Sequence, residues 1–221
     1  MKILMVSLFL ILTNTALASI KILSVRGESQ YIRENISNEL NTKSLLQLGD
    51  IIKTIGKSFV KIQLHESVIT IAPNSYFKVS GEVDSEEGSD LGTLMYGHLH
   101  ASFNKNKDNN RVIRTPTAAM GVRGTKILLH VTRDQTEYSE RFKGVIHPAP
   151  TLEELNSIVN AKNAFSQVCC ITGKIAVKTN GGTQKDLDAG EVLNYSSTGK
   201  NTKFIKYNTK ILEATAEKFG F

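Results

Sequence analysis

The sequence contains no tryptophan and has only two cysteines and four prolines in 221 residues. The cysteines, Cys169 and Cys170, are adjacent, and two thiols are too few to complete a structural zinc site. Neighbouring side chains on a strand point to opposite faces, so a disulfide between them would need a strained turn. The scarcity of cysteine therefore favours two reduced thiols, at least one of them buried, and a fold held together by its apolar core.

Long apolar runs are absent beyond the N-terminus. The run from Ile3 to Leu12 is about half as long as the roughly 20 residues of a membrane-spanning helix. Lys2 precedes it and Ala16-Leu17-Ala18 follows as a cleavage pattern, so residues 1–18 are predicted to be a signal peptide. An uncleaved anchor is the alternative. We expect an exported chain, periplasmic or secreted, that is soluble and has no stable membrane insertion after cleavage.

The excess of positive charge is small and spread along the chain. The net charge of +6 comes from 27 basic and 21 acidic residues. It favours some affinity for anionic surfaces. The basic residues are not interleaved with aromatic ones, and an exported protein does not meet nucleic acid, so we exclude nucleic acid as a partner. The length suits one domain with a real core.

Short β-strands dominate the hydrophobic pattern. Val60, Ile62 and Leu64 alternate with polar residues, and the stretch from Gly49 to Val79 holds three such segments separated by turn residues. Strands at this spacing are typical of an all-β fold. We predict a curled arrangement of short strands, similar to a β-roll or β-sandwich, over residues 19–205.

Two helices are predicted within or after this β domain. Thr151 and Glu154 have the spacing of a capping box, and apolar residues then recur every three or four positions as far as Phe165. This pattern predicts a helical insertion over about 151–167. A second helix, begun by Asn208 or Thr209, is expected within residues 206–221.

Residues 111–131 contain the clearest change of chain direction. The Thr115-Pro116-Thr117 segment interrupts one apolar run, and Gly121 and Gly124 precede the next. Glycine permits a positive φ or a close backbone approach. The steps Gly49-Asp50 and Gly190-Glu191 also place glycine before a β segment, which indicates one corner device used repeatedly. Arg123, between the two glycines, either satisfies backbone carbonyls at the corner or contacts an anionic partner.

Enzyme-like patterns are weak. His98 and His100 share one face of a strand, as in some metal sites, and His130 could be a distant third ligand, but the expected carboxylate is missing. A solvated histidine pair on an exposed face is favoured over metal binding. The acidic segment 80–90 does not fit the spacing of a calcium loop. No Gly-x-Ser-x-Gly motif occurs, so we predict a non-enzymatic protein without a cofactor.

The sequence resembles the FecR domain family. The most specific part is the segment Thr115 to Thr125, which reads T-P-T-A-A-M-G-V-R-G-T and matches the family signature nearly residue for residue. The usual Thr-Gly step departs here, since Gly56 follows Thr54 one place late. The residues that carry the resemblance are Gly49, Asp50, Pro73, Asn74, Thr115, Pro116, Gly121, Arg123, Gly124 and Thr125.

The resemblance implies an all-β domain at the cell envelope. Well-known members are transmembrane regulators that pass a receptor's signal to a sigma factor, and they use a cytoplasmic segment and a membrane helix that we expect this chain to lack. The expected role is therefore a stand-alone binding or scaffold module for an envelope protein or glycan, with Arg123, His98 and His100 as partner contacts. One alternative is a sensor component acting with a separate membrane regulator. The other is a β-coil enzyme acting on acidic polysaccharide.

Overall fold

The computed structural model describes residues 20–81, 83–84, 88–104, 111–145, 147–160, 164–196 and 203–218. The predicted signal peptide and part of the acidic segment 80–90, including Glu86 and Glu87, lie outside these residues. The described part of the chain contains no helix that is long and apolar enough to cross a membrane.

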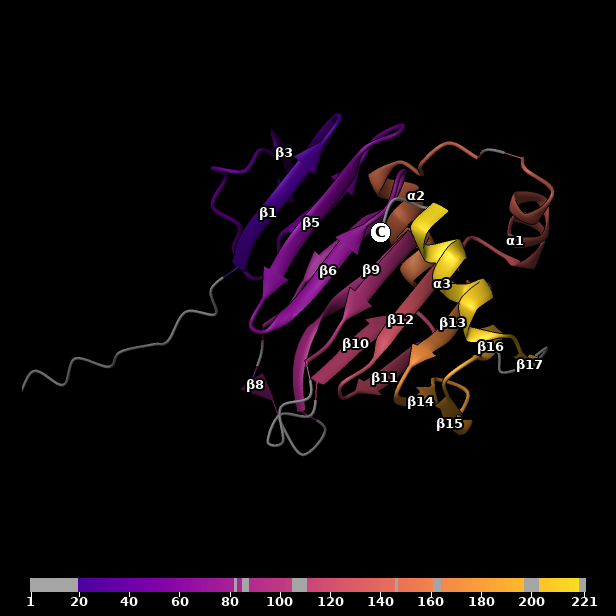
Figure 1. Cartoon of the computed structure of the whole chain (residues 1–221). Coiled ribbons are helices and arrows are strands. Elements are labelled where there is room, and N and C mark those ends of the chain that lie inside the picture. The colour runs from indigo at the N-terminus through magenta and orange to yellow at the C-terminus, as the bar shows by residue number, and fades with distance from the viewer. Residues whose placement is uncertain are drawn as a thin grey trace, which may run out of the picture.

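Two β-sheets form the body of the molecule (Figure 1). Sheet A has antiparallel neighbours throughout. Its order is β1 (Ile20–Arg26), β5 (Phe59–Leu64), β6 (Ser67–Ile71), β9 (Gly88–Ser102), β12 (Lys126–Thr132), β13 (Phe165–Thr172), β16 (Glu191–Ser196) and β17 (Lys203–Lys206).

Sheet B shares the long strand β9 with sheet A. Its order is β3 (Ile36–Glu39), β2 (Ser29–Arg33), β4 (Ile51–Thr54), β7 (Tyr76–Val79), β9, β10 (Arg111–Thr115), β11 (Ala118–Val122), β14 (Lys174–Thr179) and β15 (Gln184–Asp188). The short β8 (Val83–Asp84) pairs with the start of β9. The first part of β9 pairs in sheet B, and residues 97–102 pair in sheet A.

The core lies between the two sheets because inward and outward residues alternate along the strands. Burial alternates strictly along β5 and along β14. Sheet A contributes residues such as Ile62 and Leu99 to one large buried cluster, and sheet B contributes Phe77, Met120 and Val177. The predicted all-β, curled fold is confirmed.

The chain crosses repeatedly from one sheet to the other, and the described crossings share one backbone device. Each places a residue with positive φ at the corner. In chain order these residues are Gly27 (φ 73), Gly56 (φ 61), Asn74 (φ 52), Gly97 (φ 93), Gly124 (φ 61), Gly173 (φ 81) and Gly190 (φ 89). The crossing from β9 to β10 passes through residues 105–110, outside the described ranges. The hypothesis of a repeated corner is therefore confirmed for Gly190 but not for Gly49, which has a positive φ of 93° but lies between two strands of sheet B, β3 and β4.

Neighbouring corners fit closely against one another. A Cβ atom on Gly97 would lie 2.2 Å from the Ser75 Oγ atom, and that oxygen accepts a hydrogen bond of 2.9 Å from the His98 amide. The Gly56 amide donates to the Asn74 side chain over 2.9 Å. Added side-chain volume therefore has no place at Gly97, whereas a Cβ atom on Gly56 would meet nothing within 4 Å.

Gly121 does not belong to this set. It lies within β11, outside the group of positive-φ glycines. A Cβ atom there would meet Ala176 of β14 at an ordinary distance of 3.8 Å. Of the two glycines in the signature segment, only Gly124 makes the corner.

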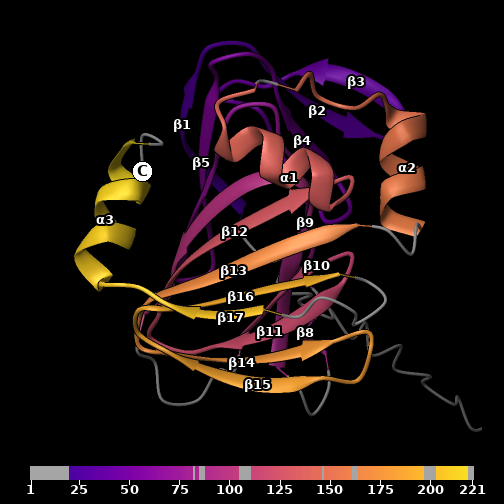
Figure 2. The same cartoon turned by 90° about the vertical axis from the view of Figure 1, so that its right-hand side faces the viewer.

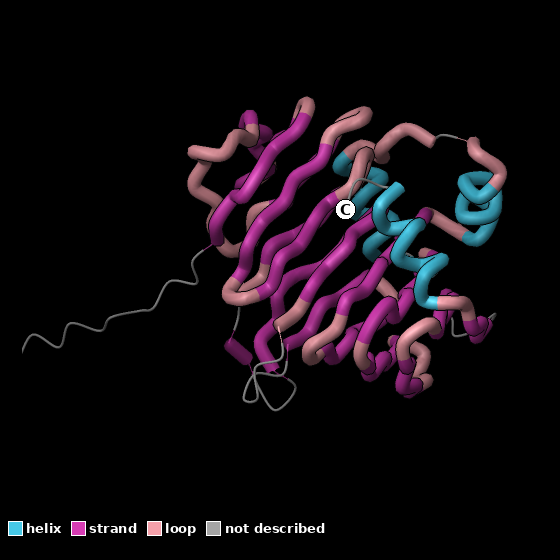
Figure 3. Tube along the Cα trace, in the orientation of Figure 1, coloured by secondary structure: helices cyan, strands magenta, loops and turns pink. Residues whose placement is uncertain are grey.

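The described residues form three helices, which lie toward the right-hand side of the molecule in Figure 3. They are α1 (Gln135–Phe142), α2 (Leu152–Asn160) and α3 (Thr209–Lys218). Figure 2 shows α2 and α3 on opposite sides of the strands. Helix α2 packs its Leu155 and Ile158 on sheet B, against residues such as Met95. Helix α3 packs its Leu212 and Ala216 on the outer face of sheet A.

The predicted helical insertion differs from the observed one. The Thr151 hydroxyl accepts the Glu154 amide over 3.2 Å and the Glu154 carboxylate accepts the Thr151 amide over 2.8 Å, so the capping box is confirmed. The helix is shorter than 151–167 because residues 165–167 belong to β13, where Phe165 packs into the sheet. Helix α1 was not predicted, and the cap between Asp134 and Glu137 that begins it is the signal that could have revealed it.

The adjacent cysteines lie on opposite faces of β13. Cys169 packs beneath α3, and Cys170 lies in the core between the sheets. Both are buried free thiols, as predicted. Burial raises the pKa of each thiol to about 12, so neither is a reactive thiolate.

Helix α1 docks on the end of β12 through an aromatic stack. The His98 and His130 rings stack with centroids 3.7 Å apart and an interplanar angle of 21°, and the centroid of the Tyr138 ring of α1 lies 5.4 Å from that of His130. Burial lowers the pKa of His98 to about 3 and that of His130 well below its ordinary value, and nearby Arg141 acts in the same direction. Both imidazoles are therefore neutral near pH 7.

The corner glycine gives a first prediction. We expect Gly124→Ala to cost about 1–2 kcal/mol of unfolding free energy, because an L-residue is disfavoured at a positive φ. Gly121→Ala is the matched control and should stay within about 0.5 kcal/mol of the wild type. Urea denaturation followed by circular dichroism measures both, and equal stability of the two variants would contradict the assignment of the corner.

The histidine stack gives a second prediction. The unfolded chain protonates His98 and His130 near their ordinary pKa of about 6.5, and the folded chain does not. Stability is therefore complete above about pH 7 and falls as the pH drops toward about 5. We expect the unfolding free energy of His130→Phe to fall by roughly 2 kcal/mol less than that of the wild type between pH 7 and pH 5. The control is His65→Asn, a substitution at an exposed histidine. Denaturation at the two pH values measures the slope, and equal slopes for wild type and His130→Phe would refute the prediction.

Candidate functional site

The signature segment Thr115–Thr125 begins with a buried turn between β10 and β11. The Thr117 hydroxyl lies 2.6 Å from the Ser166 hydroxyl, and the Thr115 hydroxyl lies 3.2 Å from that of Tyr195. All four side chains are buried, and burial raises the pKa of Tyr195 to about 12. The threonines on either side of Pro116 thus join sheet B to β13 and β16 of sheet A.

A hairpin further along the chain closes over the same turn. The Asn180 side-chain amide donates to the Pro116 carbonyl over 2.8 Å, and its backbone amide donates to the Thr117 carbonyl over 2.9 Å. These bonds satisfy turn carbonyls that would otherwise need water. The Thr-Pro-Thr part of the signature is therefore architectural.

The other end of the signature is the corner between β11 and β12. Thr125 is buried, and its carbonyl accepts the Phe103 amide over 2.9 Å. A Cβ atom on Gly173, at the next corner, would lie 2.7 Å from the Gly124 carbonyl oxygen. Gly124 and Thr125 therefore support the neighbouring corner as well as their own.

The earlier signature residues also hold the fold. The Asp50 carboxylate is 1% exposed and accepts hydrogen bonds of 2.8 and 2.7 Å from the Arg33 guanidinium. It also accepts the Gln47 amide over 2.7 Å. Gly49, with φ 93, donates to the Val79 carbonyl over 2.9 Å. This acid fixes the loop before β4 and is unavailable to a ligand.

Pro73 and Asn74 form the corner between β6 and β7. The Pro73 carbonyl accepts the Ser75 hydroxyl over 3.1 Å, and Asn74 supplies the positive φ. Asparagine tolerates this conformation better than most residues because its short side chain can bond locally.

Arg123 is the exception among the signature residues. Its side chain is exposed, and within the described part of the chain it makes no hydrogen bond or ion pair. It therefore does not satisfy the corner carbonyls, which was one of the two interpretations from the sequence. An exposed, unpaired guanidinium at a rigid corner is free to contact an anion.

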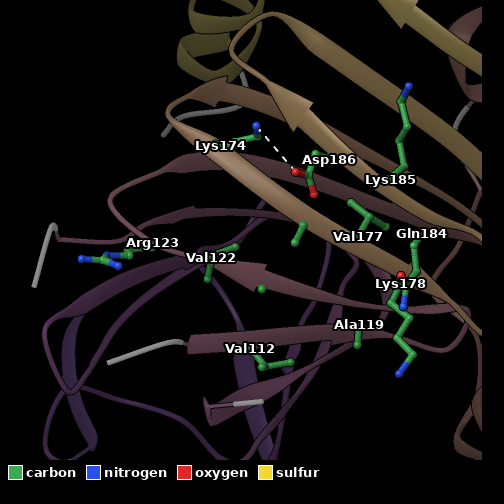
Figure 4. A pocket seen from close by; sticks show the side chains of 12 residues that line it. Val112, Ala119, Val122, Arg123, Lys174, Val177, Lys178, Gln184, Lys185 and Asp186 are labelled. Carbon is green, nitrogen blue, oxygen red and sulfur yellow. Dashed lines mark ion pairs between the residues drawn. The ribbon is translucent and has the colours of Figure 1, made fainter. Parts of the chain in front are cut away.

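Arg123 stands at the edge of a groove on the outer face of sheet B (Figure 4). The groove crosses β11, β14 and β15 and has a volume of about 620 Å³. Small residues form its floor, namely Ala119, Gly121 and Ala176, and the cationic side chains that face it are Arg123, Lys174 and Lys178. Gln184 and Asp186 also line it. We name this surface the basic groove.

The basic groove carries an excess of positive charge. Lys174 lies 3.6 Å from Asp186 and 3.8 Å from Asp188, and all three side chains are largely exposed, so these pairs are weak in water. The Lys185 ammonium lies 4.5 Å from the centre of the Phe204 ring. Asp186 is the one acid among the described lining residues, and Arg123, Lys174 and Lys178 line the groove with it. Lys185 pairs with the buried Val177, so its side chain leaves β15 on the other face and points away from Lys178 and Gln184 in Figure 4. The groove therefore favours an anionic ligand.

One local pattern in the sequence indicates part of this groove. Lys174, Ala176 and Lys178 alternate with buried Ile175 and Val177 along β14. This spacing places the two lysines on one outward face with a small residue between them. Only the folding of β11 beside β14 brings Arg123 to the same face.

The histidines are not an exposed pair, contrary to the prediction. His98 is half-buried and stacks on His130, whose side chain is buried. His100 is also half-buried, and burial lowers its pKa to about 4. In the described part of the chain, no group of three or more histidine, cysteine, aspartate or glutamate residues could hold a metal ion.

Comparison with known proteins agrees with the fold. The model of the FecR protein family matches residues 50–145. Two crystal structures of a proposed anti-sigma factor from Parabacteroides distasonis, at 1.65 and 2.50 Å resolution, superpose with TM-scores of 0.51 and 0.52 at 12% identity. The aligned region covers 75% of this chain and 64% and 63% of theirs. Among curated proteins none matches significantly.

This chain thus spans less than two thirds of the length of those crystal structures, and at this identity the similarity concerns the fold. The family match includes Arg123 and the signature turn and ends before β13. The resemblance to the FecR family is therefore confirmed for residues 50–145, the part of the chain that the family model matches.

Proposed function

We propose that this protein is a non-enzymatic binding module of the cell envelope, exported by its N-terminal signal peptide, and that the basic groove binds an acidic segment of a partner protein. The observation that carries the proposal is the exposed Arg123 guanidinium. It projects from a corner whose backbone is fixed, beside the lysines of β14.

The floor of the groove supports an extended ligand. Ala119, Gly121 and Ala176 carry little or no side chain, so a ligand backbone can approach the sheet closely. Arg123 and Lys178 lie at opposite ends of this floor in Figure 4. Acidic side chains along one extended segment could therefore meet both cations at once, which adds specificity to a general attraction.

A polypeptide is favoured over a glycan because of what lines the groove. Sugar rings are commonly held against aromatic faces, and none of the described lining residues of the groove is aromatic. The guanidinium group of arginine and the ammonium group of lysine match carboxylates in charge and in hydrogen bonding. Acidic side chains of a protein supply carboxylates without requiring a stacking surface.

The non-enzymatic assignment rests on the chemistry of the same surface. The ionisable side chains that line the groove are exposed lysines, an arginine and one aspartate that pairs with Lys174. A nucleophile activated by an adjacent base is the usual requirement for covalent catalysis, and these groups do not supply one. Binding is the function this chemistry supports.

A second candidate is a sensor component acting with a separate membrane regulator. The observation that favours it is the fold shared with the proposed anti-sigma factor. In that case the acidic segment would belong to the regulator or to its receptor. Capture of envelope proteins by immobilised wild-type protein, compared with the Arg123→Glu variant, identifies which partner depends on the groove.

Charge reversal in the groove gives the third prediction. We expect Arg123→Glu to weaken binding of a fluorescent poly-glutamate peptide by about tenfold, and the binding should weaken further as salt screens the charges. Lys21→Glu on β1 is the control, because it makes the same charge change at an exposed position far from the groove in the sheet order. Fluorescence anisotropy measures the dissociation constants.

Ala176→Tyr tests the groove without changing its charge. Its ring would fill the floor, so poly-glutamate binding should weaken although the cations remain. Equal losses in Arg123→Glu and Lys21→Glu, or no loss in Ala176→Tyr, would show that binding is non-specific and would sink the proposal. Selective binding of polygalacturonate would show that the ligand of the groove is a glycan. Release of oligosaccharides from polygalacturonate would show that the protein is an enzyme.

Export is tested separately. We expect the mature protein recovered from the cell envelope of an expressing bacterium to begin at Ser19, as measured by intact mass. A chain that keeps residues 1–18 would contradict cleavage and favour the uncleaved anchor.

A further inference from the structure

A second cavity lies on the outer face of sheet A, beneath α3 and beside α1. Its volume is about 370 Å³. It is lined by residues from β9, β12, β13 and β16 on the sheet side and by α1 and α3 above, with Tyr207 from the segment that leads into α3. We call it the helix cavity. It shares no lining residue with the basic groove.

The walls of the helix cavity are mostly apolar. Leu128 and Val192 line it from the sheet, and Ile211 and Leu212 line it from α3. The helix is held over the sheet by contact of Leu212 and Ala216 with Cys169, Ile171 and Val192. A sheet face covered by a helix normally closes completely, and here it leaves a space large enough for a small organic molecule.

Polar groups converge on the part of this cavity formed by β9, β12 and α1. His98, His130, Arg141 and Gln167 line it there. The Gln167 amide donates to the Asn194 side-chain oxygen over 2.8 Å and to the Tyr138 hydroxyl. The His130 Nε2 atom is buried and has no hydrogen-bond partner within the described part of the chain. Buried polar atoms are nearly always paired, so a missing partner at the wall of a cavity indicates a ligand or an ordered water.

The cation that lines the cavity, Arg141, is already paired, with a carboxylate that also lies 3.6 Å from the Arg133 guanidinium. The Arg141 guanidinium lies 3.0 Å from the Glu137 carboxylate, which is buried on the same helix. Hydrogen bonds from Tyr96, the Arg133 amide and Arg141 lower the pKa of Glu137 against the opposing effect of its burial, so the carboxylate stays ionised and matches Arg141. The stacked rings of His98 and His130 are too close for two positive charges to be tolerated.

We propose that the helix cavity is a binding site for a small uncharged molecule with an apolar, ring-bearing or acyl body and one hydrogen-bonding group. The apolar body lies between α3 and sheet A, and the polar group lies toward His98 and His130. Neutral imidazoles offer both a donor and an acceptor, which suits a hydroxyl, carbonyl or amine. An anionic ligand finds Arg141 already paired and gains little in exchange for its desolvation.

Two fluorescent probes that share one body test the charge requirement. N-phenyl-1-naphthylamine is uncharged, and 1-anilinonaphthalene-8-sulfonate adds a single anionic group to the same rings. We expect saturable binding of the uncharged probe, with about tenfold weaker binding of the sulfonate. Equal or tighter binding of the sulfonate would overturn the assigned ligand class.

Paired substitutions on α3 locate the binding. Thr215 lines the cavity, and within the described part of the chain its hydroxyl donates to the Ile211 carbonyl of the same helix, so Thr215→Phe fills the space at little structural cost. Ala214→Phe places the same ring on the exposed side of the same helix. We expect Thr215→Phe to abolish binding of the uncharged probe and Ala214→Phe to leave it unchanged. Equal binding by both variants would overturn the site.

His130→Phe separates hydrogen bonding from shape, because it keeps a ring in the stack and removes both nitrogens. We expect about fivefold weaker binding of the uncharged probe, the fold-change of one net hydrogen bond. Measured above pH 7, where the wild-type stack is neutral, unchanged affinity would refute the role of the imidazole. Poly-glutamate binding should be unaffected by Thr215→Phe. A negative result for the helix cavity would therefore leave the proposed function of the basic groove untouched.

Discussion

The reversal of chain direction between the two sheets is the constraint on which the rest of this structure depends. Each strand alternates inward and outward residues, so a corner misplaced by one residue would turn the next strand's apolar face to solvent. Positive-φ residues at the corners set both direction and register. Close contact between Gly97 and Ser75, and between Gly173 and the Gly124 carbonyl, makes each corner the support of its neighbour. The edge of the roll therefore forms as a unit.

The residues that point outward from each sheet determine whether a helix covers that part of the sheet. Cys169, Ile171 and Val192 are apolar on the outer face of sheet A, and α3 covers them. Lys174 and Lys178 with Ala176 between them leave the outer face of β14 and β11 open. One sheet thus offers a covered cavity and the other an open groove, and the two surfaces differ in charge because they differ in the residues that point outward.

The residues that define the FecR resemblance are mainly structural. Thr115 and Thr117 build a buried hydroxyl network, Asp50 fixes a loop through Arg33, and Gly124 makes a corner. They account for the shared fold and leave the ligand unspecified. Most of the groove's cations, and the α3 wall of the helix cavity, come from beyond the matched residues 50–145. A signature of this kind predicts architecture better than it predicts a partner.

The sequence alone determined the strand periodicity, the capping box at Thr151, the repeated glycine corners and the opposite faces of Cys169 and Cys170, because these follow from local geometry with periods of two or about 3.6 residues. It could not show that His98 stacks on His130, that Arg123 joins Lys174 and Lys178, or that residues 165–167 extend a strand rather than a helix. Those facts depend on which strands become neighbours in the sheets. Pairing partners separated by long stretches of sequence are chosen by packing of the whole core, so only the tertiary structure decided them.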